Sequence, residues 1–249
     1  MIELRKVCKR FGEQVVLDGV DFTVEDGETV ALLGPSGTGK SVLLKHINGL
    51  IHPDSGSILV DGLNVALLKR NELAQLRMRI GYVFQNGALF DSMNVFENVK
   101  LGIVDEDRAK DDGYTRERVA ECLRLVNLPP ETAAKFPAQL SGGMRKRVGI
   151  ARAIAGAPKY LLYDEPTSGL DPVNSDIIDN LVKRLSDELG VTSVMVTHDV
   201  RGAFRVADRL ALLSDGKILL QGTPEEFRAS TLEKVRAFLE RDFETEDAA

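Results

Sequence analysis

A glycine-rich segment at residues 34–41 combines the residue types that bind phosphate. It follows the apolar stretch Thr29–Leu33 and precedes an apolar helical stretch that ends before Gly49. Glycines let backbone N–H groups point inward around an anion, and the helix start adds a partial positive charge. An accidental glycine-rich turn is the alternative, expected in roughly one chain in a hundred of this length. Lys40 is expected to reach the β- and γ-phosphates, and the Ser41 hydroxyl to ligate Mg²⁺. The predicted phosphate-binding residues are Gly34, Pro35, Ser36, Gly37, Thr38, Gly39, Lys40 and Ser41.

Two consecutive acids, Asp164 and Glu165, end the apolar stretch Tyr160–Tyr163. On a parallel sheet this places both carboxylates at the carboxyl edge, where open α/β sheets bind ligands beside their phosphate loop. Asp164 suits the Mg²⁺ shell. Glu165 points elsewhere and is free to act as general base on an attacking water. A solvated strand end is the alternative for the pair.

A second anion site is predicted at Ser141, Gly142 and Gly143, within the sequence Leu-Ser-Gly-Gly-Met. The serine offers a hydroxyl, the two glycines expose backbone N–H groups, and a helix that begins here adds its dipole. Taken by itself, the same pattern also fits an ordinary helix N-cap.

These residues need strands and helices to position them. Hydrophobic patterning predicts strands in the first third of the chain, helices between about residues 88 and 156, and βα alternation in the last third, which implies a mainly parallel sheet. The predicted strands are Ile2–Val7, Val16–Val24, Thr29–Leu33, Ser57–Val60, Ile80–Phe84, Tyr160–Tyr163, Thr192–Val196, Leu210–Leu213 and Lys217–Leu220. The predicted helices lie between Gly39 and Gly49 and at Arg116–Val126, Met144–Ala155, Ser175–Leu189 and Arg201–Val206.

The composition limits the class of protein. The chain has 249 residues, 43% of them hydrophobic and 28% charged, which is typical of a globular domain with a sizeable core. The formal net charge is −6, and residues 240–249 carry most of it, so bulk charge gives no support for nucleic-acid binding. Cys8 and Cys122 fit neither a disulfide framework nor a metal site, and no apolar run approaches the ~20 residues of a membrane span.

With these motifs in this order, the chain resembles the nucleotide-binding subunit of ATP-binding-cassette (ABC) transporters over about residues 2–222. Further motifs of that family are Gln85 after Ile-Gly-Tyr-Val-Phe, Ser-Gly-Leu-Asp at 168–171, and His198 after Ser-Val-Met-Val-Thr. Leu-Ser-Gly-Gly-Met is the most diagnostic, because kinases and GTPases with a phosphate loop lack it. Met144 departs from the usual glutamine, which removes a polar contact near the partner's nucleotide.

The resemblance implies ATP and Mg²⁺ as ligands and a role for each motif. Two copies of the chain would close head to tail around two ATP molecules, with Ser141–Gly143 capping the ATP held by the partner. Gln85 would touch Mg²⁺ and the attacking water, and His198 the γ-phosphate and Glu165. Phe11 would stack on adenine. The alternatives are a capping histidine at 198 and a core phenylalanine at 11.

The predicted fold class is α/β: an ABC ATPase with a phosphate loop, a mainly parallel core sheet, an N-terminal antiparallel β subdomain and an inserted helical subdomain. Residues 1–230 form the ATPase domain, with the core at 1–87 and 157–230 and the helical subdomain at 88–156. Residues 231–249 form an extension, in which Leu232, Val235, Phe238 and Leu239 share one helical face and the acids beyond form a solvated tail.

Longer stretches around residues 34–56, 84–99 and 140–154 look like the ATPase subunit of Mla-type phospholipid transporters of Gram-negative envelopes. This implies a homodimer with an integral membrane permease, an MCE-domain lipid-binding protein and a small regulatory subunit. No nucleic acid is expected. The groove near Gln85–Val99 would receive the permease through Ala88, Leu89, Phe90 and Met93. With no secretory signal visible, the expected location is cytoplasmic, on the inner face of the inner membrane.

Other readings stay open. A soluble ABC ATPase of DNA repair or translation fits the motifs, but repair members carry a long coiled coil and translation members usually carry two cassettes. An ABC ATPase for a non-lipid substrate fits as well. A small-molecule kinase leaves Leu-Ser-Gly-Gly-Met and His198 without a role.

Overall fold

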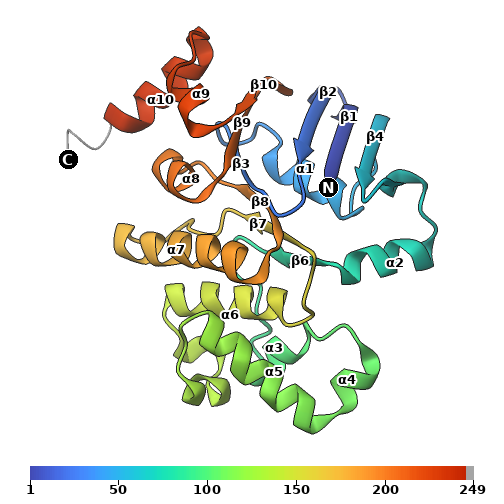
Figure 1. Cartoon of the computed structure of the whole chain (residues 1–249), viewed down its shortest axis with the longest axis vertical. Helices are drawn as coiled ribbons and strands as arrows, with labels where there is room; N and C mark the ends of the chain where they lie inside the picture. The colour runs from blue at the N-terminus through green and yellow to red at the C-terminus, as the bar shows by residue number, and fades with distance from the viewer. Residues whose placement is uncertain (245–249) are drawn as a thin grey trace. The chain divides into compact units, whose positions relative to one another are not determined.

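The computed structural model describes residues 1–244 and divides the chain into two compact units (Figure 1). The first unit comprises Met1–Leu73 and the residues from Thr192 onward, and the second comprises Ala74–Val191. These bounds differ from the predicted core and helical subdomain, so that division stays a prediction.

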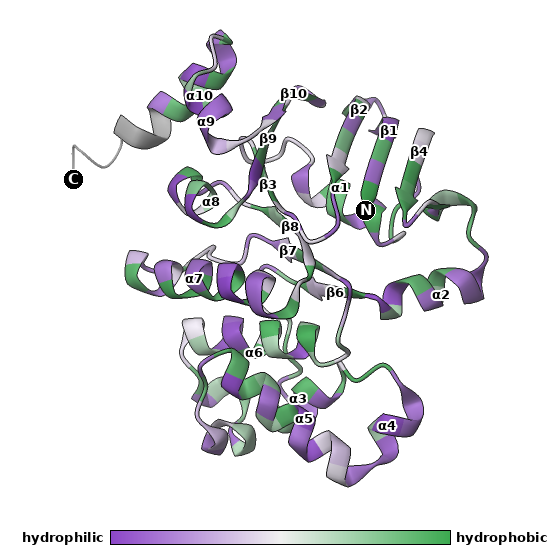
Figure 2. Cartoon of the chain, viewed as in Figure 1, coloured by the Kyte–Doolittle hydropathy of each residue, from purple (hydrophilic) through white to green (hydrophobic). Residues whose placement is uncertain are grey.

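The first unit begins with an antiparallel sheet of four strands in the order β2-β1-β4-β5. These are β1 (Ile2–Phe11), β2 (Gln14–Val24), β4 (Ser55–Val60) and β5 (Leu63–Asn64). Ile2 pairs with Val24 on one side and with Val60 on the other. Hydrophobic and hydrophilic bands alternate along β1 in Figure 2, as expected for a strand with one buried face. The predicted antiparallel N-terminal part is therefore confirmed.

The first unit also contains strands in the order β10-β9-β3-β8. These are β3 (Thr29–Leu33), β8 (Thr192–Val196), β9 (Arg209–Ser214) and β10 (Lys217–Gly222). Strand β3 is fully buried and runs parallel to both β8 and β9, whereas β9 and β10 form an antiparallel hairpin. The helices of this unit are α1 (Lys40–Ile47), α8 (Val200–Val206), α9 (Pro224–Arg228) and α10 (Glu233–Glu244).

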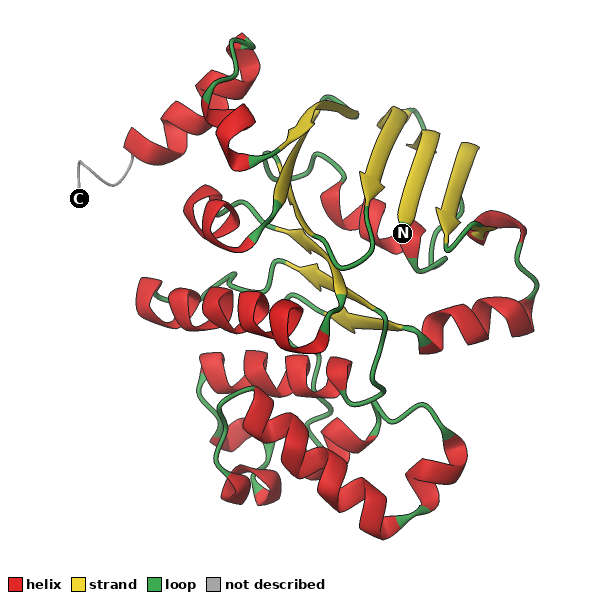
Figure 3. Ribbon diagram, viewed as in Figure 1, coloured by secondary structure: helices red, strands yellow, loops and turns green. Residues whose placement is uncertain are grey.

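The second unit is mostly helical, as the red ribbons of Figure 3 show, and contains two parallel strands. The strands are β6 (Ile80–Val83) and β7 (Tyr160–Asp164). Its helices are α3 (Val95–Lys100), α4 (Glu106–Lys110), α5 (Asp112–Leu125), α6 (Gly142–Ile154) and α7 (Pro172–Leu189). Helix α2 (Arg70–Met78) lies at the boundary between the two units. Helix α4 buries no residue and is mainly purple in Figure 2.

The α/β class with mainly parallel central strands is confirmed, and the differences lie in element ends and short helices. Helices α5 and α7 begin earlier than predicted because Asp111 and Asp171 cap them, and Pro172 provides a preset first helical position. Helices α2, α3, α4 and α9 were not predicted individually. Capping boxes at Asn94–Glu97 and Thr223–Glu226 were the available signals for α3 and α9.

The predicted amphipathic helix of the extension exists as α10, but its apolar face is smaller than expected. Val235 and Leu239 are buried, whereas Leu232 precedes the helix and is exposed. Residues 245–249, which belong to the predicted acidic tail, lie outside the described residues. Within residues 1–244, no helix is both long enough and apolar enough to cross a membrane.

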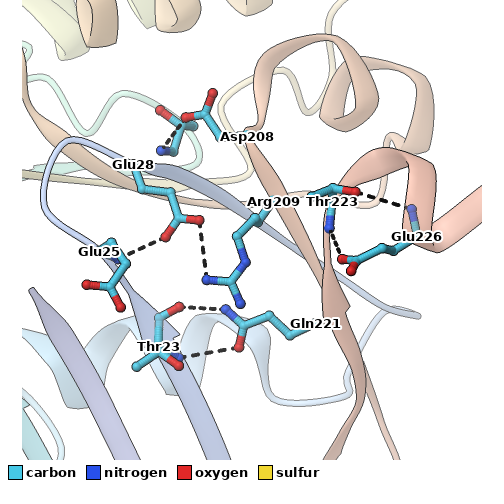
Figure 4. A network of polar contacts seen from close by, with 9 residues as sticks. Thr23, Glu25, Glu28, Asp208, Arg209, Gln221, Thr223 and Glu226 are labelled. Atoms are coloured by element: carbon cyan, nitrogen blue, oxygen red, sulfur yellow. Dashed lines mark hydrogen bonds and ion pairs between the residues drawn. The ribbon is translucent and has the colours of Figure 1, made fainter.

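A polar network in the first unit joins the strands around β3 (Figure 4). The Glu28 carboxylate accepts from the Glu25 N–H at 2.8 Å and pairs with Arg209 at 3.3 Å. Gln221 bonds to the backbone of Thr23, donating to its carbonyl oxygen at 2.5 Å and accepting from its N–H at 3.4 Å. The Gln221 amide thus takes the place of a neighbouring strand and joins β10 to β2.

We expect Gln221→Ala to lower the free energy of unfolding by about 1–3 kcal/mol, because two partly buried backbone groups of Thr23 lose their partner. Gln14→Ala, at an exposed glutamine of β2, is the matched control and should change it by less than about 0.5 kcal/mol. Urea denaturation measures both. Equal losses in the two variants would contradict the assigned role of Gln221.

Candidate functional site

The phosphate loop (residues 34–41) lies between β3 and α1 in the first unit, as its sequence predicts. Gly34, Gly37 and Gly39 have φ values of 151°, 82° and 100°, a region that disfavours side chains. A Cβ atom at Gly34 would lie 2.3 Å from the carbonyl oxygen of Leu213 in β9. The loop therefore requires glycine for its backbone angles and also for its close contact with the neighbouring strand.

Lys40 is only 4% exposed and points back into its own loop. Its ammonium donates to the carbonyl oxygens of Gly34 at 2.7 Å and Pro35 at 3.0 Å. Gly39 precedes α1 in a left-handed conformation, and no side chain caps the helix at this position. A buried cation and a helix start without a side-chain cap together make this loop suitable for an anion.

Two other predicted residues also belong to the first unit. Phe11 ends β1 and is 48% exposed, and the Lys9 ammonium lies 5.4 Å from its ring centroid. Such exposure rules out the alternative of a core phenylalanine. His198 is exposed in the turn between β8 and α8, where Asp199 caps the helix by accepting from the Gly202 N–H at 2.9 Å. The capping function at this turn thus belongs to Asp199 and not to His198.

The second unit contains the predicted acids at the end of β7. Asp164 is buried, and its carboxylate accepts from the Tyr82 hydroxyl at 2.9 Å. Burial, followed by the charge of Asp164, raises the pKa of Tyr82 far above its usual range, so this hydroxyl stays protonated and keeps donating. The alternative of a simple solvated strand end therefore fails for Asp164.

Glu165 takes a different backbone conformation from its neighbour, with φ at 47°. Its carboxylate accepts from the Gln85 side-chain amide at 3.0 Å, and the same amide donates to the Ser168 hydroxyl at 3.2 Å. Two adjacent carboxylates thus have separate partners, Tyr82 for one and Gln85 for the other. The structure brings together Gln85 and Glu165, which lie 80 positions apart in the sequence.

Ser141 caps helix α6, its hydroxyl accepting from the Met144 N–H at 3.3 Å. The N-cap alternative for this segment is therefore confirmed. The Ser141 side chain is exposed in this position. A Cβ atom at Gly143 would lie 2.9 Å from the Asn174 amide oxygen, so this glycine allows α6 to approach α7. Asn174 also donates to Asp171 at 2.6 Å, a contact that lowers the pKa of the Asp171 carboxyl.

Sequence reasoning missed the residues that contact the predicted site residues but lie far from them along the chain. Tyr82 supports Asp164, and Asn174 contacts the Gly143 position. Lys146 reaches the backbone of Gln85 and Glu165. None of them belongs to a spacing pattern with chemical meaning, so the sequence offered no signal for these contacts.

Comparison with known proteins agrees with these motifs. A family model described as ABC transporter matches residues 17–168. The chain is 38% identical over 239 residues to the intermembrane phospholipid transport system ATP-binding protein MlaF of Haemophilus influenzae, covering 96% of this chain and 90% of that protein. It is 44% identical over 229 residues to the methionine import ATP-binding protein MetN of Leifsonia xyli, covering 89% and 65%. It is 43% identical to the sulfate/thiosulfate import ATP-binding protein CysA of Bradyrhizobium diazoefficiens, covering 90% and 64%.

Solved structures give the same result. A dimeric ATP-binding cassette in a post-hydrolysis state, bound to ADP and phosphate, superposes with a TM-score of 0.82 at 37% identity, covering 90% of this chain and 99% of that one. A cassette of Clostridium perfringens, part of the cbiONQ transporter complex, gives a TM-score of 0.82 at 31% identity, covering 97% and 98%. This chain therefore belongs to the ABC transporter family, as an ATP-binding subunit that hydrolyses ATP to ADP and phosphate.

Proposed function

We propose that this subunit drives phospholipid transport between the membranes of a Gram-negative envelope. The observation that carries the proposal is the 38% identity to MlaF over 96% of this chain, together with the Mla-like stretches around residues 34–56, 84–99 and 140–154. The similar identities to the methionine and sulfate proteins favour the alternative of a non-lipid substrate. Affinity purification from membranes distinguishes a lipid from a non-lipid substrate.

In the proposed ATP site, the phosphate loop and Lys40 bind the triphosphate, and Phe11 stacks on the adenine ring. The left-handed glycines and the buried ammonium support the first role, and the exposure of Phe11 supports the second. Ser41, Gln85 and Asp164 would hold Mg²⁺, because a hydroxyl, an amide oxygen and a carboxylate are the hard oxygen donors that this ion prefers. When bound, Mg²⁺ would neutralise charge on the phosphates.

Glu165 is the proposed general base, with Gln85 orienting it and the water that it activates. The hydrogen bond between the two side chains supports this pairing. His198 would donate to the developing charge on the γ-phosphate, a role that its exposed position after β8 allows.

Two copies of the chain would close around two ATP molecules, with Ser141, Gly142 and Gly143 completing the partner's site. The exposed Ser141 at the start of α6 supports this, and so does the dimeric form of the similar cassette with ADP and phosphate. The dimer would lie on the cytoplasmic face of the inner membrane. Its partners would be a permease, an MCE-domain lipid-binding protein and a small regulatory subunit.

The proposed permease-docking segment comprises residues 88–93. Phe90 is 54% exposed, although the segment that carries it is firmly held. The buried amide of Asn98 accepts from the Phe90 N–H at 2.8 Å and donates to the carbonyl oxygens of Phe90, Met93 and Asn94 at 3.0–3.1 Å. An apolar side chain on a fixed backbone is suited to receive a helix of a membrane protein.

The phosphate-loop role predicts that Lys40→Ala weakens ATP binding by at least about 10- to 100-fold, because a charged contact to phosphate is lost. Fluorescent-ATP titration measures the affinity, with Lys45→Ala in the same helix as the control. Unchanged affinity in the Lys40 variant would contradict the assignment.

The general-base role predicts that Glu165→Gln binds ATP but hydrolyses it roughly 10²- to 10⁴-fold more slowly. Size-exclusion chromatography should then detect a dimer stabilised by Mg-ATP. Glu188→Gln, at an exposed position of α7, should keep normal turnover. Turnover near wild type in Glu165→Gln would remove this residue from the base role.

The transport proposal predicts that affinity purification from membranes recovers an integral membrane permease together with phospholipids, identified by mass spectrometry. Phe90→Asp should reduce permease recovery about tenfold or more, since a charge in an apolar contact is costly. Leu189→Asp, at another exposed apolar residue, is the control. Recovery of a permease with an amino-acid or sulfate receptor would select a non-lipid substrate, and recovery of ribosomes or repair factors alone would reverse the proposal.

A further inference from the structure

Lys146 is a buried cation with an unusual set of partners. It lies on α6 and is only 5% exposed, and its ammonium donates to the carbonyl oxygens of Gln85 and of Glu165, the latter at 3.4 Å. In the part of the chain that the structure describes, it forms no ion pair. Burial lowers its pKa, and the negative charge of Glu165 opposes that shift.

The two carbonyls belong to the residues whose side chains bond to each other. Gln85 donates to the Glu165 carboxylate at 3.0 Å, so Lys146 holds the backbones of both members of this pair. Glu165 also has a left-handed backbone, which is unfavourable for a non-glycine residue and persists only where surrounding contacts enforce it. The ammonium at its carbonyl oxygen is one such contact.

The same face of α6 also holds the residues that follow Gln85. Arg152 donates to the carbonyl oxygens of Gly87 at 2.7 Å and Ala88 at 2.8 Å. A Cβ atom at Gly149 would lie 3.0 Å from the Gly87 Cα, so the loop runs directly against the helix. Positions 146, 149 and 152 recur at intervals of three and form one stripe of the helix. Helix α6 therefore begins at Ser141 and carries the segment 85–88 along its side.

We propose that Lys146 is a positioning residue for ATP hydrolysis, which fixes the backbones of Gln85 and Glu165 to helix α6. Through this contact, the helix that begins at Ser141 and the proposed base move as one body. A displacement of α6 would therefore move the base relative to the water that it activates. The inference rests on the proposed role of Glu165 and adds a residue that acts through it.

The test compares Lys146→Met with Arg118→Met. Arg118 also binds backbone carbonyls, at the other end of α6, donating to the carbonyl oxygens of Ile154 at 2.6 Å and Ala155 at 2.9 Å. It forms an additional ion pair with Glu121 at 2.6 Å, and it touches neither Gln85 nor Glu165. Both variants lose a cation that binds backbone carbonyls. Only Lys146→Met should lower kcat, by on the order of 10- to 100-fold, with the KM for ATP unchanged within about twofold.

Hydrogen exchange followed by mass spectrometry provides a second readout. The Gly87 N–H bonds to the Phe84 carbonyl oxygen and the Ser168 N–H to that of Glu165. Both regions should exchange faster in Lys146→Met and stay unchanged in Arg118→Met. Should Lys146→Met not fold, Lys146→Gln removes the charge while keeping a polar side chain, and the same split between kcat and KM is expected.

Two outcomes would overturn the inference: a normal kcat in the Lys146 variants, or equal losses of kcat in the Lys146 and Arg118 variants at equal thermal stability. The second outcome would show that Lys146 only stabilises the fold and does not position the proposed base. Glu165→Gln distinguishes this failure from that of the proposed function. If Glu165→Gln is inactive and Lys146→Met is normal, only the positioning role fails, whereas an active Glu165→Gln removes the base on which the inference depends.

Discussion

Binding an anion through backbone N–H groups is the constraint on which the rest of this molecule depends. Such binding requires left-handed backbone at Gly34, Gly37 and Gly39 and a helix that starts directly behind them. The buried strand β3 holds the start of this loop in place, and the carbonyl oxygen of Leu213 leaves no room for a side chain at Gly34. The Lys40 ammonium donates hydrogen bonds to two carbonyl oxygens of the phosphate loop, so this cation lies within the loop. The bound anion and the neighbouring strand β9 thus both require a glycine at position 34.

Hydrolysis imposes a different constraint, because adjacent carboxylates must avoid each other. The change of backbone conformation between Asp164 and Glu165 solves this problem. One carboxylate is held by a tyrosine whose hydroxyl remains protonated, and the other by an amide. A neutral donor stabilises a carboxylate without adding a competing cation, which leaves the negative charge available to bind a metal ion or to accept a proton. The left-handed backbone at Glu165 thus accompanies two consecutive acids that have separate hydrogen-bond partners.

The parts of this arrangement that sequence could predict are those with local causes. The phosphate loop, the acids after β7 and the cap at Ser141 each depend on residues within a few positions, and all were found. Tyr82, Asn174 and Lys146 act on residues far away in the sequence, and their contacts depend on helix packing that no spacing encodes. Short helices were not predicted for a related reason. Helix α4 buries no residue, so its sequence lacks hydrophobic periodicity, and the N-cap at Asp105 is its main local signal. The apolar face of the extension was overestimated at Leu232 because periodicity does not mark where α10 begins.

The ATP chemistry of this chain is independent of the molecule that is transported, and the reason is physical. In the proposed site, hydrolysis of ATP uses the same loop, acids and capping serine whatever is moved, which agrees with the similar identity of relatives named for phospholipid, methionine and sulfate transport. Differences between these systems must enter through surfaces that meet other proteins. Residues 88–93 are the surface proposed for such a contact, since Asn98 holds their backbone through hydrogen bonds while the Phe90 side chain is exposed. Arg152 binds the carbonyl oxygens of Gly87 and Ala88, so hydrogen bonds join the start of the proposed docking segment to the helix that begins at Ser141.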